Sequence, residues 1–233
     1  MKVFAISDLH LSINNSKPMN IFGPVWDNYL DEIIADWNKK VSEDDIVLLA
    51  GDLSWAMKLE DAKADIEFLK DLKGTKILIR GNHDYWWSTI SKVRNILPKG
   101  IYALQNDSMV FGDYIFCGTR GWIVDDSKMT DSNDKKIFDR ELIRLEMSLQ
   151  EAKKKQEEDE NKQIICLIHY PPFDKNNNPT KFTDLIEKYG VKTVVYGHLH
   201  GKVPNVKEIL TLNGVNYYLT SCDMVKNKLI EIL

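Results

Sequence analysis

Short runs of apolar and β-branched residues alternate along the first part of the chain with segments whose apolar positions repeat at helical spacing. Residues 2–6, 45–50 and 76–80 form three such runs, and each predicts a buried strand. Between them, apolar residues recur every three or four positions over 25–37 and 59–69, which predicts two amphipathic helices. This alternation is typical of an α/β protein in which helices cover a sheet.

The middle of the chain departs from this alternation. Residues 101–104, 109–111 and 114–118 predict three short strands in succession. A polar stretch over 125–136 predicts an exposed loop, and apolar positions at helical spacing then predict a long helix. Its last part, 153–162, carries almost no apolar residue, so we expect a solvated helix end there rather than a binding tail.

The last third returns to strands and helices in turn. Residues 163–168 and 192–196 predict two strands, with a helix over about 182–189 between them. The pattern over 210–218 predicts a β-hairpin that turns at an Asn-Gly pair. A final strand is expected over 229–233, and no repeat or linker divides the chain.

The composition limits the class of protein. With 233 residues, 43% of them hydrophobic and 28% charged, the chain can build one sizeable core, and we expect a single domain over residues 1–233. The net charge of −4 argues against a general nucleic-acid binder, although bound metals can reverse the local sign. The three cysteines are scattered, which indicates buried free thiols in a reducing compartment.

The chain shows no signal for a membrane or for export. No apolar run approaches the roughly 18 residues that a membrane-spanning helix needs. Asp8 and His10 interrupt the apolar start too early for a signal peptide. We therefore expect a soluble cytoplasmic protein without a membrane partner, and the sequence leaves its oligomeric state open.

The candidate chemistry lies in the histidines. All five lie in four short segments that also carry Asp, Asn, Gly or Pro, and a fifth, acidic segment has the same form without a histidine. Several of these segments directly follow predicted strands, and ligands of α/β proteins bind beyond the carboxyl ends of strands. The segments are Asp8-Leu9-His10, Gly51-Asp52-Leu53, Gly81-Asn82-His83-Asp84, His169-Tyr170-Pro171-Pro172 and Gly197-His198-Leu199-His200-Gly201.

These segments offer a mixture of oxygen and nitrogen donors. Such a mixture suits Mn, Fe, Zn or Ni better than Ca, which prefers oxygen alone. Seven donors are too many for one open catalytic ion, and with a shared carboxylate they suit two ions about 3.5–4 Å apart. The donors are Asp8, His10, Asp52, Asn82, His169, His198 and His200.

Taken in order from residue 8 to residue 200, the five segments resemble the full signature of the calcineurin-like metallophosphoesterase superfamily. The resemblance implies a four-layer α/β/β/α sandwich of two mixed sheets flanked by helices. It also implies a dinuclear metal site that binds two divalent or mixed-valence transition-metal ions. By this resemblance Asp8, His10 and His200 hold the first metal, Asn82, His169 and His198 hold the second, and Asp52 bridges the pair.

The resemblance also implies a reaction. A hydroxide that bridges the two ions would attack the phosphorus of a phosphate monoester or diester in line. His83 holds no metal in the family pattern, so it is the candidate general acid, and Asp84 is expected to orient it. Asn82, His83 and Arg120 are the candidate substrate-binding residues, because an arginine can bind a phosphate as a fork, although a surface role for Arg120 stays open.

Two other functions stay open for a chain of this kind. One is a nuclease with the same chemistry, which the acidic composition and the absence of a nucleic-acid module disfavour. The other is a catalytically silent scaffold, which the complete donor set disfavours. A protein phosphatase is disfavoured because Gly51-Asp52-Leu53-Ser54-Trp55 departs from Gly-Asp-x-Val-Asp-Arg-Gly. The lipid A pathway hydrolase is disfavoured because it usually has Arg where His83 stands.

Several aromatic residues follow the donor segments and allow two interpretations. They can form the wall of a substrate pocket and stack on a ring, or they can fill the core under the loops. We favour the core for Trp87. The aromatic residues concerned are Trp55, Tyr85, Trp86, Trp87 and Trp122.

Overall fold

The computed structural model describes residues 1–14, 17–124 and 132–233. Its first sheet has five strands in the order β11-β1-β2-β3-β4. Strands β1 to β4 are parallel, and β11 is antiparallel to β1 at the edge. These strands are β1 (Val3–Ile6), β2 (Ile46–Leu49), β3 (Thr75–Leu78), β4 (Ile101–Ala103) and β11 (Ile230–Glu231).

The second sheet has six strands in the order β5-β6-β7-β8-β10-β9. Its four inner strands are parallel, while β5 and β9 are antiparallel edges. Both sheets are therefore mixed. The strands are β5 (Ser108–Phe111), β6 (Tyr114–Thr119), β7 (Gln163–Ile168), β8 (Thr193–Tyr196), β9 (Ile209–Leu212) and β10 (Val215–Leu219).

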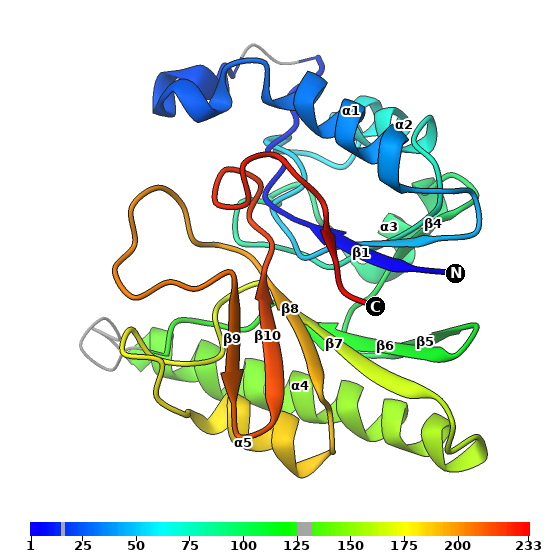
Figure 1. The fold of residues 1–233 in the computed structure, drawn as a ribbon, viewed down its shortest axis with the longest axis vertical. Coiled ribbons are helices and arrows are strands. Elements are labelled where there is room, and N and C mark those ends of the chain that lie inside the picture. Colours follow the sequence, from blue (N-terminus) through cyan, green and yellow to red (C-terminus); the bar gives the residue numbers. More distant parts are fainter. Residues whose placement is uncertain (15–16, 125–131) are drawn as a thin grey trace.

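Helices cover the outer face of each sheet (Figure 1). The first sheet packs on α1 (Tyr29–Lys40), α2 (Lys63–Lys70) and α3 (Ile90–Ile96). The second sheet packs on α4 (Ser132–Glu158) and α5 (Lys181–Lys188). The expected four-layer α/β/β/α sandwich is confirmed. Among the described residues no helix is both long and apolar enough to cross a membrane.

A layer of apolar side chains separates the two sheets. Along β1, Val3 and Ala5 join this middle layer, while Phe4 and Ile6 join the core under the helices. From the second sheet, Phe116 lies in the same middle layer. Strands that are buried on both faces explain why the sequence shows continuous apolar runs instead of alternation.

Several boundaries differ from those that the sequence predicts. The helix expected over 59–69 begins only at Lys63, and the strand expected over 229–233 is shortened to Ile230–Glu231. The helix expected over 25–37 begins only at Tyr29, because Asn28 has a left-handed backbone (φ 53°) and Pro24–Trp26 form a separate 3-10 turn. The loop expected over 125–136 is wrong for its last residues, since α4 begins at Ser132. Residues 125–131 lie outside the described part of the chain.

Two other expectations are confirmed. The hairpin of β9 and β10 turns at Asn213 (φ 51°) and Gly214 (φ 77°). Two consecutive residues with positive φ are what a tight type I′ turn requires. Helix α4 ends at Glu158, and Lys154 and Glu158 near its end are exposed, as expected for a solvated helix end.

Candidate metal centre

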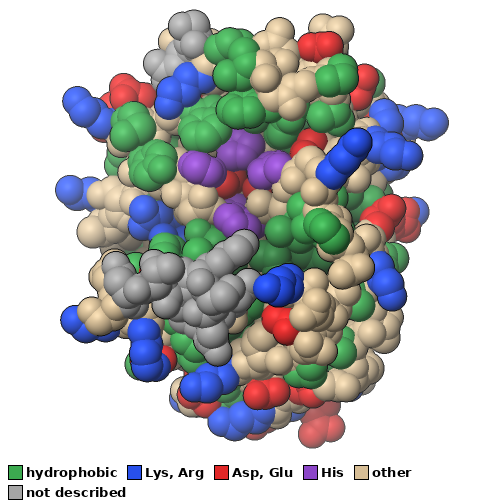
Figure 2. Space-filling model, turned by 90° about the vertical axis from the view of Figure 1, so that its left-hand side faces the viewer, with side chains coloured by type: hydrophobic (Ala, Val, Ile, Leu, Met, Phe, Trp, Pro, Cys, Tyr) green, Lys and Arg blue, Asp and Glu red, His purple; other side chains and the backbone are tan. Residues whose placement is uncertain are grey.

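The histidines and several carboxylates meet at one face of the molecule, between the two sheets (Figure 2). The segments that follow β1, β2 and β3 supply the donors of the first sheet. The segments that follow β7 and β8 supply those of the second. The first group is Asp8, His10, Asp52 and Asn82, and the second is His169, His198 and His200.

Four of these donors have a left-handed backbone: Asp8 (φ 58°), His10 (φ 47°), Asp52 (φ 51°) and His198 (φ 71°). This conformation is uncommon for residues other than glycine, although Asp and His tolerate it better than most. Such strain persists only where the surrounding fold enforces it, and it concentrates at functional sites. Here it turns successive side chains toward a common centre.

Two glycines, Gly81 and Gly197, lie so close to donor carboxylates that no larger residue would fit in their place. A Cβ on Gly81 would collide with the carboxylate of Asp52, and a Cβ on Gly197 would collide with that of Asp8. Glycine is therefore required at both positions by close approach. This explains why the donor segments carry glycine next to their polar residues.

Asp8, His10 and His200 form the first group of donors. The Nε2 atoms of His10 and His200 lie 3.4 Å apart, and His200 Nε2 lies 3.4 Å from Asp8 Oδ1. On its other side, His200 Nδ1 donates a hydrogen bond of 2.8 Å to Asp223 Oδ1. Because a carboxylate only accepts, this bond fixes the proton on Nδ1 and leaves Nε2 to face the centre.

Asn82, His169 and His198 form the second group. Asn82 Oδ1 lies 2.7 Å from His169 Nε2 and 2.8 Å from His198 Nδ1. His169 Nδ1 donates to the backbone oxygen of Ala50 at 2.9 Å, so its Nε2 carries a lone pair in the neutral ring. When the ring is neutral, His169 Nε2 and Asn82 Oδ1 are both acceptors and lie 2.7 Å apart. A cation bound by both atoms would stabilise this arrangement.

Asp52 lies between the two groups. Its Oδ2 is 3.9 Å from His10 Nε2 and 3.5 Å from His169 Nε2. In the part of the chain that the structure describes, this buried oxygen has no hydrogen-bond partner, while Oδ1 accepts from the backbone N–H of His83 at 2.7 Å. A buried carboxylate oxygen without a partner is costly, and a cation on each side would compensate it.

The carboxylates of the site repel one another. Burial, together with the charges of Asp8 and Asp84, raises the pKa of Asp52 to about 9. A raised pKa means that the surroundings disfavour an additional negative charge at this position. Divalent cations reverse that preference, because a bound ion is usually the largest local charge in its site. The electrostatics of the centre therefore fit a metal.

The histidines differ in their protonation. Burial lowers the pKa of both His10 and His198 to about 3, so both are neutral and have a lone pair to offer. Burial acts in the same direction on His200, but hydrogen bonds with Asp223 and Asp8 outweigh it and raise its pKa to about 10. The carboxylates around His200 thus favour positive charge at the position where a cation would bind.

His83 lies at the margin of the donors. Its ring centroid is 5.7 Å from that of His10 and 4.8 Å from that of Trp55. Burial and the neighbouring histidine charges, first that of His169, lower its pKa. Its Nδ1 is buried and without a hydrogen-bond partner among the described residues.

Asp84, which is expected to orient His83, makes its hydrogen bonds with other groups in the described residues. The Asp84 carboxylate is fully buried, and in the described part of the chain it makes no hydrogen bond to His83. It instead joins the loop after β2 to the loop after β3 and holds them in register. Its donors are the backbone N–H groups of Leu53, Ser54 and Gly81 and the indole N–H of Trp86.

Arg120 does not belong to the donor cluster. Its guanidinium lies over the ring of Trp122, 4.6 Å from the centroid, and 3.7 Å from the carboxylate of Glu141. Trp122 contacts Tyr170, whose ring lies 4.1 Å from that of His198. Arg120 therefore connects to the metal centre through two aromatic side chains.

The aromatic residues divide between core and site. Trp86 and Trp87 are 1% and 4% exposed and belong to the core under the helices, so the core interpretation of Trp87 is confirmed and extends to Trp86. Trp55 stacks on His10 at 4.7 Å and lines a cavity of about 360 Å³ that also touches His83 and His200. On the other side, Trp122, Tyr170 and His198 line a cavity of about 540 Å³.

Sequence reasoning missed the residues that position the donors from the C-terminal part of the chain. Asp223 binds His200, and the Ser221 hydroxyl donates to Asp8 Oδ2 at 3.0 Å. Both follow β10, which pairs with β8 in parallel. Polar residues after the hairpin strand were the available signal, since the ends of parallel neighbours meet at one edge.

Comparison with known proteins agrees with this geometry. The sequence profile of the calcineurin-like phosphoesterase family matches residues 1–202, most of the chain. The chain therefore belongs to the calcineurin-like phosphoesterase family and is a metal-dependent hydrolase of phosphoric esters. No curated protein matches the sequence at a significant level.

Solved structures resemble it in fold. Phosphopantetheinyl hydrolase from Mycobacterium tuberculosis matches with a TM-score of 0.58 and 14% identity, over 100% of this chain and 95% of its own. A protein of unknown function from Aquifex aeolicus matches with a TM-score of 0.53 and 14% identity, over 99% of this chain and 95% of its own. At such identity the likeness concerns the fold alone.

Proposed function

We propose that this chain hydrolyses phosphate monoesters or diesters of small molecules at a dinuclear metal centre. The observation that carries the proposal is the position of Asp52, whose unpartnered Oδ2 lies between two separate groups of donors. A single ion would leave one of these groups without a cation. Because the donors come from both sheets, we also propose that residues 1–233 act as one catalytic domain. We place this domain in the cytoplasm as a separate proposal.

The two groups would each hold one divalent ion. Mixed oxygen and nitrogen donors fit Mn, Fe, Zn or Ni. When bound, the two ions supply positive charge for the phosphate oxygens and activate the attacking water. The proposed ligands are Asp8, His10 and His200 for one ion, Asn82, His169 and His198 for the other, and Asp52 for both.

The fixed protein groups prepare the donors. Asp223 and the backbone oxygen of Ala50 hold protons on the outer nitrogens of His200 and His169, so the inner nitrogens would be free to bind the ions. Ser221 donates to Asp8 and restrains its carboxylate. The donors are therefore set before substrate arrives, which lowers the cost of reorganisation during the reaction.

His83 is proposed as the acid that protonates the leaving oxygen, and with Asn82 it would contact the substrate. Its backbone N–H is fixed to Asp52, while its half-buried ring lines the cavity beside Trp55. The lowered pKa makes its protonated form a stronger acid than ordinary histidine. In the described residues Asp84 makes no hydrogen bond to the ring, which instead contacts Trp55 and His10.

The test combines metal analysis with substrate turnover. Purified protein reconstituted separately with Mn, Fe, Zn and Ni should bind two ions per chain. It should then hydrolyse p-nitrophenyl phosphate or its bis-ester far faster than single-stranded DNA. Binding of one ion per chain would contradict the dinuclear centre. Faster cleavage of DNA would favour a nuclease, and full metal loading without any turnover would contradict the proposed reaction.

A further inference from the structure

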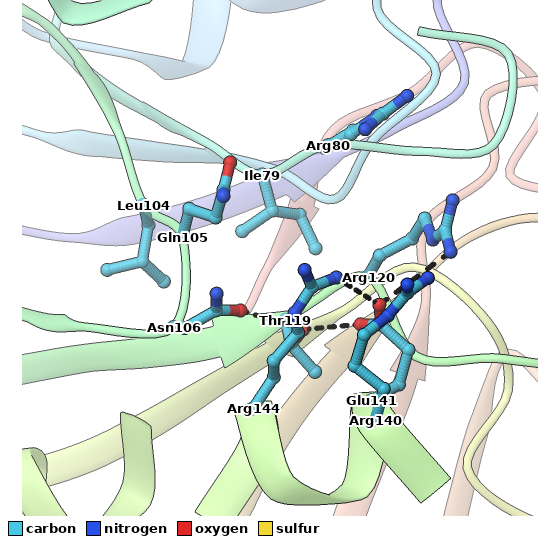
Figure 3. Close-up of a pocket in the computed structure, with 10 residues that line it drawn as sticks. All are labelled: Ile79, Arg80, Leu104, Gln105, Asn106, Thr119, Arg120, Arg140, Glu141 and Arg144. Atoms are coloured by element: carbon cyan, nitrogen blue, oxygen red, sulfur yellow. Dashed lines mark hydrogen bonds and ion pairs between the residues drawn. The ribbon is translucent and has the colours of Figure 1, made fainter. Parts of the chain in front are cut away.

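A second polar cavity, of about 270 Å³, lies beside α4 and the ends of β3 and β6 (Figure 3). Four arginines line it: Arg80, Arg120, Arg140 and Arg144. The whole chain contains only five arginines, and its other basic side chains are lysines. Arginine presents a planar fork that matches phosphate oxygens, whereas lysine presents a point charge. Four of the five arginines of this protein therefore lie where guanidinium groups could bind phosphate oxygens together.

The charges in the cavity do not balance. Glu141 is its only acidic lining residue among those described, and it is 1% exposed. Its carboxylate accepts from Arg144 at 2.6 Å and from the Thr119 hydroxyl at 2.8 Å, and lies 3.7 Å from Arg120. Four guanidinium groups against one carboxylate leave a surplus of three positive charges.

Several donors in the cavity lack acceptors. The Nε atoms of Arg80 and Arg120 are buried, and neither has a hydrogen-bond partner among residues 1–14, 17–124 and 132–233. In the same described ranges, the side chains of Arg80 and Arg140 make no ion pair with an acidic residue. A buried donor without an acceptor is costly, and an oxyanion in the cavity would supply acceptors and charge together.

We propose that the cavity formed by Arg80, Arg120, Arg140 and Arg144 is a binding site for a phosphate-type anion, separate from the metal centre. The anion is a group with at least two negative charges, because a surplus of three positive charges requires more than a single one. Thr119 and Asn106 on the cavity wall supply neutral polar groups beside the arginines.

The cavity and the metal centre share backbone. Arg80 directly precedes Gly81 and Asn82, which lie at the metal centre. The backbone oxygen of Arg120 accepts from the N–H groups of His169 (3.1 Å) and Tyr170 (3.0 Å). An anion held by both arginines would therefore fix the two segments that carry Asn82 and His169.

The first experiment separates anion binding from the metal centre. Calorimetric titration of inorganic phosphate uses the Asp52→Asn protein, in which binding to metal ions is weakened. Phosphate should bind this protein, and adding Arg140→Ala with Arg144→Lys should weaken the affinity at least about tenfold, the equivalent of one charged hydrogen bond. Arg144→Lys keeps a positive charge beside Glu141, and thermal melting checks that the variant is folded.

The matched control is Lys154→Ala, which removes one positive charge from an exposed position of the same helix outside the cavity. It should leave phosphate affinity unchanged. Equal affinities in the arginine variant and this control would overturn the proposal. So would the complete absence of phosphate binding in the Asp52→Asn protein at millimolar concentration.

The anion can come from a separate small molecule or from a second phosphate on the substrate, and kinetics distinguishes the two. For a separate molecule, sulfate added to the wild-type enzyme should change its turnover of p-nitrophenyl phosphate, and the arginine variant should not respond. For a second phosphate on the substrate, the arginine variant should raise the KM for a sugar bisphosphate relative to that for p-nitrophenyl phosphate.

Discussion

The metal centre and the arginine cavity lie on either side of the segment that follows β3, and they are opposite in character. The centre gathers acceptors that lack donors, as Asp52 Oδ2 and His169 Nε2 show. The cavity gathers donors that lack acceptors, as the Nε atoms of Arg80 and Arg120 show. A buried cluster of acceptors is suited to a cation and a buried cluster of donors to an anion.

The two clusters also differ in how they are built. Short side chains on a strained backbone form the metal centre, so their positions follow directly from the fold. Long flexible side chains form the cavity, two of them from α4 (Figure 3). A catalytic centre needs positions accurate to a fraction of an ångström, whereas charge attraction tolerates adjustment. We therefore expect substitutions to be most damaging at the centre.

The largest expected effect is that of Asp52→Asn. The amide retains an oxygen but loses the charge that the two proposed ions would share, so kcat/KM should fall by about 10³-fold or more. Elemental analysis should show fewer than two ions per chain. Asp113→Asn, in the turn between β5 and β6, is the control. A variant with full metal content and normal turnover would contradict the proposed role of Asp52 as a ligand of both ions.

The next effect is that of His83→Ala. A general acid contributes about 10²–10⁴-fold, and its loss should slow esters with poor leaving groups most. Metal content should be retained, because His83 belongs to neither donor group. A plot of log kcat against leaving-group pKa should become steeper than in the wild type. An equal slowdown for all esters would show that His83 does not act as the acid.

Asp223→Ala should have a smaller effect. Loss of a residue that orients a ligating histidine typically costs about 10–100-fold in metal affinity or activity. Asp223→Asn should recover part of the loss, since an amide oxygen can still accept from His200 Nδ1. Metal titration of both variants measures the difference. Wild-type metal affinity in Asp223→Ala would show that Asp223 does not position His200.

The smallest effect concerns Asp45, which belongs to neither cluster and serves as a reference for stability alone. Burial acts to raise its pKa, but hydrogen bonds from the Lys2 N–H (2.7 Å), the Ser42 N–H (2.8 Å) and the Ser42 hydroxyl (2.7 Å) lower it below 3.8. The carboxylate therefore stabilises the fold above pH 3.8, and this contribution is lost as the pH falls through the lowered value.

Asp45→Asn should thus lower the melting temperature at pH 7 by about 2–4 °C, the equivalent of one hydrogen bond in a chain of this length. The difference in melting temperature between the variant and the wild type should shrink at acidic pH, where Asp45 is protonated in both the folded and the unfolded protein. Ester turnover should not change. A constant difference in melting temperature at every pH would show that charge is not involved.

The sequence predicted the strands well and placed the candidate donors at strand ends, because both rest on local signals. Continuous apolar runs marked β2 and β7, and polar residues after strands marked Asp52 and His169. The start of α1 was missed because a single left-handed residue, Asn28, interrupts an otherwise helical pattern.

Contacts between distant segments could not be read from spacing. Asp84 follows His83 directly, which suggested a pair, but its carboxylate turns to donors 30 and 31 residues earlier in the chain. Asp223 has no motif of its own and meets His200 only because β10 lies beside β8. The grouping of four arginines depends in the same way on α4 crossing the second sheet.

The apolar layer between the sheets has a role beyond stability. One sheet supplies Asp52 and Asn82 and the other supplies His169, so side chains such as Phe116 in this layer set the distance between the two halves of the metal centre. Because packed cores transmit changes of even one methylene, trimming such a residue would alter the separation of the two groups of donors. Catalysis in this enzyme can therefore be tuned from its interior, by residues that never touch metal or substrate.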